Sequence, residues 1–427
     1  MLWQNLENKV IGIWGQGKEG LAVAKAIAEH CHNYRIVNIS EDNTADIDEC
    51  EVLVKSPGVS LYRKEIADAL AKGIVVTSGT NLFFANKGKN VKVVAVSGTK
   101  GKSTTSSLIY HTLKYLGKDV ELGGNIGRPL VELADSNAEW VVAEMSSYQC
   151  ADCIGKADIG VLLNLYPEHL QWHGSHEQYW ADKLNMIKQA KVRLLNAKDS
   201  RITEMTKGMT AYKYNGGEVI HIQDGYFYDE REKLFAEDCL PLLGEHNAEN
   251  ACAVLTVVKL LGEAVENCKE AFRSFKGLPH RLAIVTNIDG ITFVDDSIST
   301  TPETAIAALK ALDRGEVMTL IAGGYDRGQD YEKLAEFLVS LHGRVKLIVL
   351  PDTGERLAAA VEMKGGEAFR VKDMSEAVNT AEKITPCNGC VILSPAAPSY
   401  NLYKNFEERG EDFSNCIKML AKRKKIE

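Results

Sequence analysis

A glycine-rich segment at residues 98–104 carries residue types that bind a nucleoside triphosphate. It reads Gly98-Thr99-Lys100-Gly101-Lys102-Ser103-Thr104, after an apolar run at 91–97 and before a helical pattern at 107–113. The N–H groups of such a turn and the positive end of the helix suit phosphate oxygens. We expect Lys102 to reach the outer phosphates and the Ser103 hydroxyl to bind Mg²⁺. The fit to the general phosphate-loop pattern is imperfect around Val96, so a plain strand-to-helix turn is the alternative.

Candidate metal ligands stand at the ends of two further apolar runs. Glu144 ends the run at 140–144, and Glu168 and His169 follow the run at 159–164. The carboxyl ends of parallel strands meet at the edge of the sheet where open α/β folds keep their sites. Mg²⁺ prefers oxygen ligands, so we expect Glu144 to hold a metal beside the triphosphate. Taken alone, His169 is more typical of a surface loop, but its place beside the other candidate ligands favours a site residue. Lys183 has the pattern of an ordinary helical lysine.

A second glycine turn lies near the start of the chain. Gly15-Gln16-Gly17-Lys18-Glu19-Gly20 stands between a strand pattern at 9–14 and a helical pattern at 21–27. The spacing is that of a dinucleotide site, but Asn38 stands where such a site has an acidic residue for the ribose. Because a glycine turn at a helix start accepts any phosphate, the diphosphate of a nucleotide sugar fits equally. The turn Ser56-Pro57-Gly58 follows the next strand on the same edge.

The last third of the chain adds charged residues at strand ends. Arg281 follows Leu-Pro-His, Asp295 and Asp296 end the strand at 292–295, and Arg327 follows a glycine pair after the strand at 318–322. Such residues suit the stabilisation of a transferring phosphoryl group. They do not by themselves identify the acceptor.

These residues require parallel sheets to bring them together, and the chain alternates strand and helix patterns throughout. We predict an α/β protein of three domains, with a central doubly wound sheet resembling a P-loop ATPase and Rossmann-like domains on either side. A polar stretch at 85–90 and Gly277-Leu278-Pro279 suggest the boundaries. The predicted domains are 1–87, 88–277 and 278–427.

The composition is that of a globular protein. The 427 residues carry a net charge of −8, which argues against a nucleic-acid partner despite a basic end at 422–425. No apolar run reaches the ~18–20 residues that cross a bilayer, so we expect a cytoplasmic protein without membrane insertion. The ten cysteines are expected to be reduced. The pairs Cys150/Cys153 and Cys387/Cys390 are too far apart in sequence to favour a shared zinc site over scattered thiols.

Several motifs, in order along nearly the whole chain, resemble those of the Mur ligase family. Besides the loop at 98–104 they are Gly124-Asn125-Ile126-Gly127, Glu144-Met145-Ser146-Ser147-Tyr148-Gln149, Glu245-His246-Asn247-Ala248-Glu249-Asn250, Leu278-Pro279-His280-Arg281, Asp296-Ser297, and Leu393-Ser394-Pro395-Ala396 with 404–410. The match is closest to the glutamate-adding branch of the family. Several independent motifs in the right order are much more specific than any single one.

The resemblance implies an ATP-dependent amide ligase of peptidoglycan synthesis that adds D-glutamate to UDP-N-acetylmuramoyl-L-alanine. An acyl phosphate would form first, which splits one difficult step into two easier ones. The same ligation with L-glutamate is the alternative. The resemblance further implies that domain 1–87 binds the UDP-substrate, domain 88–277 binds ATP and domain 278–427 binds glutamate. We expect a monomer that binds ATP, two Mg²⁺ ions, glutamate and the UDP-sugar.

The resemblance also assigns residues. The catalytic residues would be Lys102, His169 and Lys183, with Lys183 carbamylated, and the metal ligands Ser103, Glu144, His169 and Lys183. ATP would be bound by residues 98–104 together with Asn250, Arg281 and Asp296. The UDP-substrate would be bound by Gly15, Gln16, Gly17, Asn38, Ser56, Pro57, Gly58, Asn125, Ser147 and Gln149. Glutamate would be bound by His169, Thr300, Arg327, Ser399, Tyr400 and Phe406.

The chain departs from the D-glutamate-adding pattern at two positions. Ile298 and Arg327 stand where that branch typically carries lysines of the glutamate pocket. Arginine and lysine are not interchangeable in carboxylate recognition, so the handedness of glutamate stays open. More remote alternatives are a catalytically silent nucleotide-binding regulatory protein, folylpolyglutamate synthesis, and an NAD(P)-dependent oxidoreductase that rests on the turn at 15–20 alone.

Overall fold

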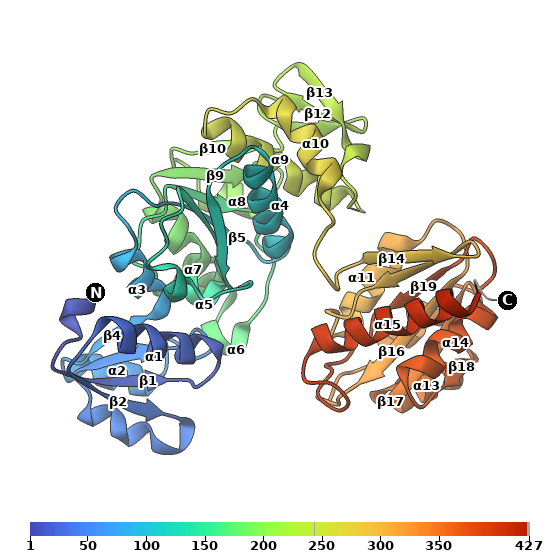
Figure 1. Ribbon diagram of the computed structural model, residues 1–427, viewed down its shortest axis with the longest axis horizontal. Coiled ribbons are helices and arrows are strands. Elements are labelled where there is room, and N and C mark those ends of the chain that lie inside the picture. Colours follow the sequence, from blue (N-terminus) through green and yellow to red (C-terminus); the bar gives the residue numbers. More distant parts are fainter. Residues whose placement is uncertain (243, 425–427) are drawn as a thin grey trace. The chain divides into compact units, whose positions relative to one another are not determined.

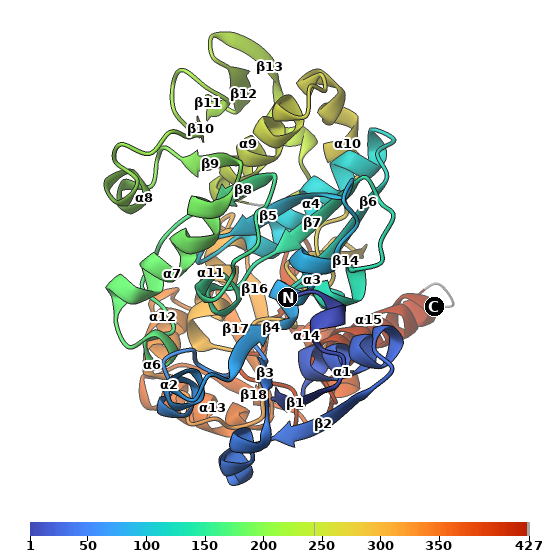
Figure 2. The ribbon, with the colours of Figure 1, turned by 90° about the vertical axis from the view of Figure 1, so that its left-hand side faces the viewer.

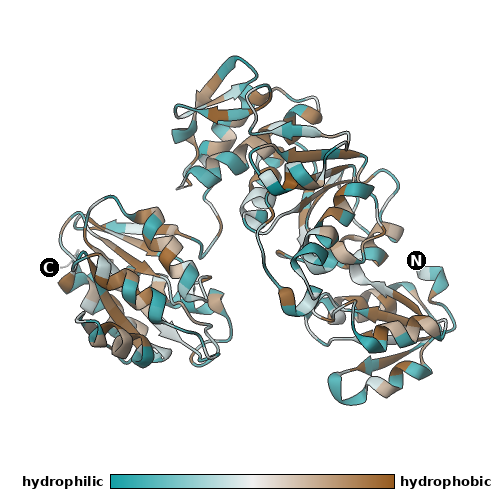
Figure 3. Ribbon diagram, turned by 180° about the vertical axis from the view of Figure 1, so that it is seen from behind, coloured by the Kyte–Doolittle hydropathy of each residue, from teal (hydrophilic) through white to brown (hydrophobic). Residues whose placement is uncertain are grey.

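The computed structural model describes residues 1–242 and 244–424, and it divides into two compact units, residues 1–275 and 276–427. Each unit is built mainly of parallel strands in sheets that helices cover (Figure 1). The strands are largely apolar, and the helices carry hydrophilic residues on their outer sides (Figure 3). The predicted α/β class is therefore confirmed.

The first sheet of unit 1 is fully parallel, with the order β2-β1-β3-β4. Because β1 and β3 are adjacent and parallel, the loops that follow them lie side by side at one edge of the sheet. These two loops are the two glycine turns singled out in the sequence. The strands are β1 (Lys9–Trp14), β2 (Tyr34–Ile39), β3 (Val52–Lys55) and β4 (Val75–Ser78). The helices are α1 (Lys18–His30), α2 (Lys64–Ala71) and α3 (Gly79–Asn86).

The second sheet of unit 1 holds β5 (Lys92–Ser97) between β8 (Ile159–Leu162) and β7 (Trp140–Glu144) (Figure 2). All its pairs are parallel, so the loop after β5 opens between two neighbouring strand ends. The outer strands are β6 (Val120–Gly124), β9 (Val192–Asn196) and β10 (Tyr212–Tyr214).

Alternate residues of β5 face two separate cores. Val94 and Val96 pack with α4 (Lys102–Tyr115) and α9 (Glu245–Leu260), while Val93 and Ala95 pack with α7 (His176–Gln189). The remaining helices are α5 (Ser147–Ala151), α6 (Leu170–His173), α8 (Ser200–Met205) and α10 (Cys268–Ser274). The strand is therefore buried on both faces, which explains its continuous apolar run.

A small antiparallel sheet in unit 1 was not expected from the sequence. It consists of β11 (His221–Gln223), β12 (Tyr226–Asp229) and β13 (Glu232–Ala236). Phe227 and Phe235 anchor it to the core beside α9 and α10, where both rings contact Phe272 edge-on.

Unit 2 contains one six-stranded sheet with the order β14-β15-β19-β16-β17-β18, parallel except for the β14–β15 hairpin. Helices α11 to α13 share one core with the sheet, and α14 and α15 share the other. The strands are β14 (Ala283–Ile288), β15 (Ile291–Asp295), β16 (Met318–Gly324), β17 (Val345–Asp352), β18 (Ala368–Arg370) and β19 (Cys390–Leu393). The helices are α11 (Pro302–Leu312), α12 (Glu332–Ser340), α13 (Thr353–Met363), α14 (Met374–Ile384) and α15 (Phe406–Lys424).

Short 3₁₀ helices complete the described chain: η1 (Trp3–Asn5), η2 (Glu41–Glu49), η3 (Leu130–Leu133), η4 (Glu237–Cys239) and η5 (Val265–Asn267). The division at 275/276 lies close to the predicted boundary at 277/278, whereas the boundary at 87/88 falls inside unit 1 and stays a prediction. All ten cysteines are free thiols, as expected. No helix in the described ranges combines the length and apolarity that crossing a membrane requires. Lys425 of the basic end lies outside the described residues.

Candidate active site

The loop between β5 and α4 adopts the geometry of a phosphate-binding turn. Gly101 has a φ of +83°, and a Cβ added there would come within 2.7 Å of the Asn250 amide nitrogen on α9. Only glycine therefore lets the predicted nucleotide residue Asn250 lie against the loop. The Asn164 side chain also holds the loop, accepting from the Lys100 N–H at 2.8 Å and donating to the Lys100 carbonyl at 3.0 Å. We assigned Asn164 no role from the sequence, although its position just beyond a strand end was a usable signal.

Two lysines converge on one carbonyl of this loop. Lys102 Nζ donates to the Gly98 and Thr99 carbonyls at 3.0 Å each, and Lys183 Nζ donates to the Gly98 carbonyl at 2.7 Å. Lys183 is 1% exposed, and burial, followed by the Lys102 charge, lowers its pKa to about 7. Burial also lowers the pKa of Lys102. The loop thus combines two amines with a helix N-terminus, an arrangement that favours polyanions.

Glu144, at the end of β7, is fully buried and only partly satisfied. Its Oε1 accepts from Asn125 Nδ2 at 2.8 Å, while Oε2 has no hydrogen-bond partner among the described residues. An orphaned buried carboxylate oxygen costs free energy unless another group takes it up, and a Mg²⁺ ion would do so. The predicted substrate residue Asn125 is therefore found orienting the predicted metal ligand.

His169 begins α6 with a left-handed backbone, at a φ of 56°. Its ring is half-exposed and lies 5.2 Å from the Tyr148 ring. Burial lowers its pKa, which favours the neutral imidazole that a metal ligand requires. The preceding Glu168 forms an ion pair with Lys100 of the phosphate loop. This contact connects the strand end of β8 to the loop after β5.

A cavity of about 690 Å³ opens at His169. Its lining comes from loops and helices that follow strands of both parallel sheets of unit 1, and it includes Gly58, Ser60, Tyr148, His169 and Trp172. The cavity therefore joins the predicted UDP-substrate turn to the predicted catalytic histidine. Tyr148 and Trp172, whose rings stack at 4.6 Å, were not predicted as site residues.

The residues expected to hold magnesium do not form a cage of protein ligands alone. Among the described residues, no three His, Cys, Asp or Glu side chains are grouped as a metal site. Mg²⁺ commonly takes one or two carboxylates together with phosphate oxygens and water. Glu144 Oε2 and the Ser103 hydroxyl at the start of α4 fit that pattern, with the phosphates of a bound nucleotide supplying further ligands.

The first glycine turn is closely packed against the second. Gly15 has a φ of +100°, its carbonyl accepts from the Ser56 hydroxyl at 3.0 Å, and an added Cβ would lie 2.8 Å from Ser56 Oγ. A Cβ at Gly20 would lie 1.9 Å from the Gly15 carbonyl oxygen, so only glycine fits at this third residue of α1. Gln16 donates to the Ile13 carbonyl at 3.0 Å. The turns at 15–17 and 56–58 thus lie together at one sheet edge, and the exposed Asn38 lies on the adjacent β2.

Two other predicted substrate residues, Ser147 and Gln149 on α5, are buried and hydrogen-bonded within the protein. Ser147 Oγ lies 3.0 Å from His173 Nε2, and Gln149 Nε2 lies 3.5 Å from Glu19 of the first glycine turn. Burial raises the pKa of Glu19 to about 7. These contacts connect α5 to α6 and to the start of α1.

The predicted residues of unit 2 lie at the carboxyl ends of its adjacent strands β15, β19 and β16. Asp296 is buried and accepts from Ser394 Oγ at 2.8 Å, and burial raises its pKa to about 6. The Arg327 guanidinium lies over the Tyr400 ring at 5.3 Å. The Ser297 hydroxyl donates to the Phe406 carbonyl at 2.8 Å. Arg281 lies in the loop before β14, and Thr300 lies with Asp296 in the loop after β15. Ser399 is buried in the loop after β19.

Arg409 on α15, which we did not predict, organises this edge. It is 1% exposed and donates to Ser297 Oγ at 3.0 Å, to the Ser297 carbonyl at 2.8 Å and to the Ala397 carbonyl at 3.0 Å. One guanidinium therefore ties the loop after β15 to the loop after β19.

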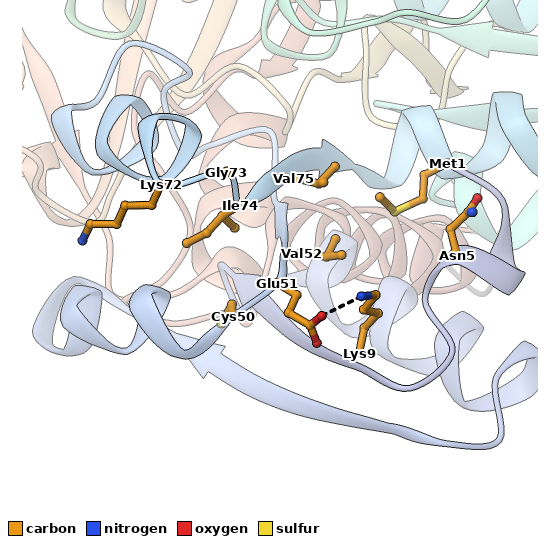
Figure 4. Close-up of a pocket in the computed structure, with 10 residues that line it drawn as sticks. All are labelled: Met1, Asn5, Lys9, Cys50, Glu51, Val52, Lys72, Gly73, Ile74 and Val75. Carbon is orange, nitrogen blue, oxygen red and sulfur yellow. Dashed lines mark hydrogen bonds and ion pairs between the residues drawn. The ribbon is translucent and has the colours of Figure 1, made fainter.

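A second cavity, of about 550 Å³, lies at the opposite end of the first sheet (Figure 4). Lys9, Val52 and Val75 begin β1, β3 and β4, so the cavity is at the amino ends of the strands. Its Lys9–Glu51 ion pair is half-exposed. Open parallel sheets bind ligands at the other edge, so this cavity is not the candidate site.

Comparisons with known proteins show which family the chain belongs to. Residues 96–258 match the Mur ligase middle domain, and residues 280–397 match the glutamate ligase domain of Mur ligases. A UDP-N-acetylmuramoyl-L-alanine--L-glutamate ligase from a Micromonospora species is 35% identical over 99% of both chains. A protein of the same name from Xanthomonas euvesicatoria is 34% identical over 96% of this chain and 95% of its own. The chain therefore belongs to the Mur ligase family.

Solved structures show the same fold. UDP-N-acetylmuramate-alanine ligase from Thermotoga maritima matches with a TM-score of 0.60 at 18% identity, covering 96% of this chain and 99% of that one. The MurF ligase of the same organism, in complex with ADP, has a TM-score of 0.60 at 18% identity, covering 98% and 97%. Membership of the family confirms the expected enzyme class, an ATP-dependent acid–amino-acid ligase of peptidoglycan synthesis.

Proposed function

We propose that the protein joins L-glutamate to UDP-N-acetylmuramoyl-L-alanine, with ATP activating the carboxylate of the UDP-substrate as an acyl phosphate. The observation that carries the proposal is the convergence of Lys102 and Lys183 on the Gly98 carbonyl, in a chain that aligns along 99% of its length with a ligase of this name. A carboxylate is a poor acyl donor, and phosphorylation gives it a leaving group. The amine of glutamate then attacks the acyl carbon, and phosphate departs.

The residues of unit 1 would divide this work. Lys102 and the N–H groups at 98–104 bind the outer phosphates and offset the charge that develops during transfer. Asn125 holds Glu144 with Oε2 turned away, where it would serve a Mg²⁺ ion together with Ser103. Mg²⁺, when bound, would neutralise phosphate charge. His169 borders the cavity that Gly58 also lines, and we assign this cavity to the UDP-substrate and its reacting carboxylate.

We also propose that Lys183 is carbamylated. The neutral amine would attack CO₂ and release a proton, so that a cation becomes an anion able to bind a second Mg²⁺. The burial of Lys183 beside Lys102 supports this, because a buried second cation is costly there and a carbamate would reverse its charge.

The proposal takes L-glutamate, the alternative left open by the sequence. The names of the relatives support it, as does the loss of lysine at Ile298 and Arg327. Arg327 presents a planar fork held over the Tyr400 ring, and this suits a different carboxylate geometry from that of a lysine.

The function is tested by measuring phosphate release with ATP, Mg²⁺, UDP-N-acetylmuramoyl-L-alanine and either L- or D-glutamate. We expect phosphate release only when all components are present, and faster turnover with L-glutamate. ATP hydrolysis that is indifferent to the UDP-sugar would refute the ligase reaction, and faster turnover with D-glutamate would refute the stereochemistry alone.

The carbamate is tested with Lys183→Ala and the control Lys188→Ala, an exposed lysine on the same helix. Lys183→Ala should abolish ligation and regain part of it with added short-chain carboxylates, while Lys188→Ala should behave as wild type. Full activity of Lys183→Ala, or no response to any carboxylate, would count against the carbamate.

A further inference from the structure

A buried carboxylate joins the two sheets of unit 1 beside the candidate site. Asp182, the residue before Lys183 on α7, is 4% exposed. Its Oδ1 accepts from the Tyr62 hydroxyl at 2.6 Å and from Gln178 Nε2 at 2.8 Å, and its Oδ2 lies 2.5 Å from His173 Nδ1. Tyr62 belongs to the loop after β3, so the carboxylate bridges residues 120 apart in sequence.

His173 connects Asp182 to Ser147 on α5. Its ring is buried between Asp182 and Ser147, with Nε2 3.0 Å from Ser147 Oγ. A carboxylate oxygen only accepts, so Nδ1 must carry a hydrogen. In the neutral ring Nε2 then accepts, which makes the Ser147 hydroxyl its donor and fixes the direction of that hydrogen. Asp182 therefore sets the orientation of a side chain that it does not touch.

The loop that contains Tyr62 is held against α6 by further hydrogen bonds. Ser60 Oγ donates to the Trp172 carbonyl at 2.7 Å, and the Trp172 indole N–H donates to the Pro57 and Gly58 carbonyls at 3.1 and 3.2 Å. The Tyr62 and Trp172 rings meet edge-on at 5.9 Å. The turn at 56–58, with its strand β3, is thus tied to α6 and α7 rather than free to move as a loop.

We propose that Asp182 is a positioning residue for the UDP-substrate, holding Tyr62 on one side and His173 with Ser147 on the other, so that the turn at 56–58 faces the cavity at His169. This inference rests on the proposed function, because it takes that cavity as the UDP-substrate site. The phosphate loop has its own supports in Asn164 and Lys102. The network should therefore govern the affinity for the UDP-substrate and not that for ADP.

The test compares Tyr62→Phe with Tyr115→Phe, the same chemical change at a half-exposed tyrosine. Tyr115 ends α4, about 20 Å along the helix from Lys102. Calorimetric titration of each full-length variant with UDP-N-acetylmuramoyl-L-alanine and, separately, with ADP gives both affinities. We expect Tyr62→Phe to bind the UDP-substrate about tenfold more weakly, as for a lost hydrogen bond to a charged group, and ADP with unchanged affinity. Tyr115→Phe should match wild type for both ligands.

Asp182→Asn and the double variant Tyr62→Phe/Asp182→Asn measure the energetic coupling between the two residues. If Asp182 acts through Tyr62, the double variant should bind the UDP-substrate no more weakly than Asp182→Asn alone. The inference is overturned if Tyr62→Phe binds the UDP-substrate as tightly as Tyr115→Phe does, or if it weakens ADP binding equally, which would mark a general loss of structure. Should Asp182→Asn fail to fold, the comparison of Tyr62→Phe with Tyr115→Phe decides. If the wild-type protein binds ADP but not the UDP-substrate, the proposed function is refuted. That result is seen in the wild type alone, so it can be distinguished from a difference between the variants.

Discussion

Replacing Lys55 with methionine is expected to lower the free energy of unfolding of unit 1 by about 3–5 kcal/mol. Lys55 ends β3 with its side chain buried, and its Nζ lies 3.0 Å from Oδ2 of Asp152, just after α5. The contact is an ion pair without hydrogen-bond geometry. The Trp172 ring lies 5.7 Å from the same nitrogen. The pair thus joins the first sheet to the elements around the second.

The magnitude follows from the separation and the burial. At an effective dielectric constant of about 20, unit charges at the observed separation attract by about 5–6 kcal/mol. Desolvation offsets much of this in the intact pair, but the single substitution removes the attraction and leaves the Asp152 carboxylate buried alone. The double variant Lys55→Met/Asp152→Leu removes both charges, and its stability should return to within about 1–2 kcal/mol of wild type.

Tryptophan fluorescence is the suitable assay. The five tryptophans, at positions 3, 14, 140, 172 and 180, all lie in unit 1, so urea unfolding followed at their emission reports that unit. Lys9→Met is the control, since its ion pair with Glu51 is half-exposed and screened by solvent, and its unfolding curve should stay close to wild type. If Lys55→Met is no less stable than Lys9→Met, or if the double variant gains nothing over the single one, the reasoning is refuted.

Three substitutions in unit 2 give further predictions. The pKa of Asp296 rises from 3.8 to about 6 on folding, so the folded state favours the protonated carboxyl, and about 3 kcal/mol of stability present at low pH is lost as the pH rises through about 6. Hydrogen exchange of the β15 amides, corrected for intrinsic rates, measures this stability at each pH. Asp296→Asn should not show the loss, and an equal pH dependence in both proteins would contradict the prediction. Gly410→Ala places a Cβ 2.1 Å from His280 Nδ1 and should destabilise unit 2 by about 1–3 kcal/mol, which calorimetry would detect as a lower unfolding temperature; an unchanged temperature argues against the close contact. Arg327→Lys loses the planar fork over Tyr400 and should raise KM for glutamate about tenfold without changing KM for ATP, whereas a KM within about twofold of wild type would place Arg327 outside the pocket.

Much of the fold could be predicted because its signals are local. The run at 91–97 is buried on both faces in β5, and the glycine pattern at 98–104 begins α4 as expected. Glu144 could be placed at a strand end because β7 has a clear apolar run with a sharp polar end. Such patterns report on neighbouring residues along the chain, and parallel sheets bring strand ends to one edge without further information.

What the sequence could not provide depends on contacts between distant residues. The burial of Lys183 is invisible in a helical pattern, and it follows only from the packing of α7 beneath the phosphate loop. Asp182 and Tyr62 are unremarkable residues until the two sheets of unit 1 meet. The antiparallel sheet at 221–236 was missed because its strands are short and its apolar residues few. Short strands carry too little periodicity to be recognised.

The Gly98 carbonyl has a consequence for how this site can change during evolution. Lys102 at the phosphate loop and Lys183 on α7 both donate to this oxygen, although Lys183 lies 85 residues from Gly98 in sequence. A backbone change that displaces this carbonyl would disturb the anchoring of both side chains. Residues 98, 102 and 183 therefore form an epistatic unit: a substitution tolerated at one of them depends on the identity of the other two, and the three are expected to be retained or lost together.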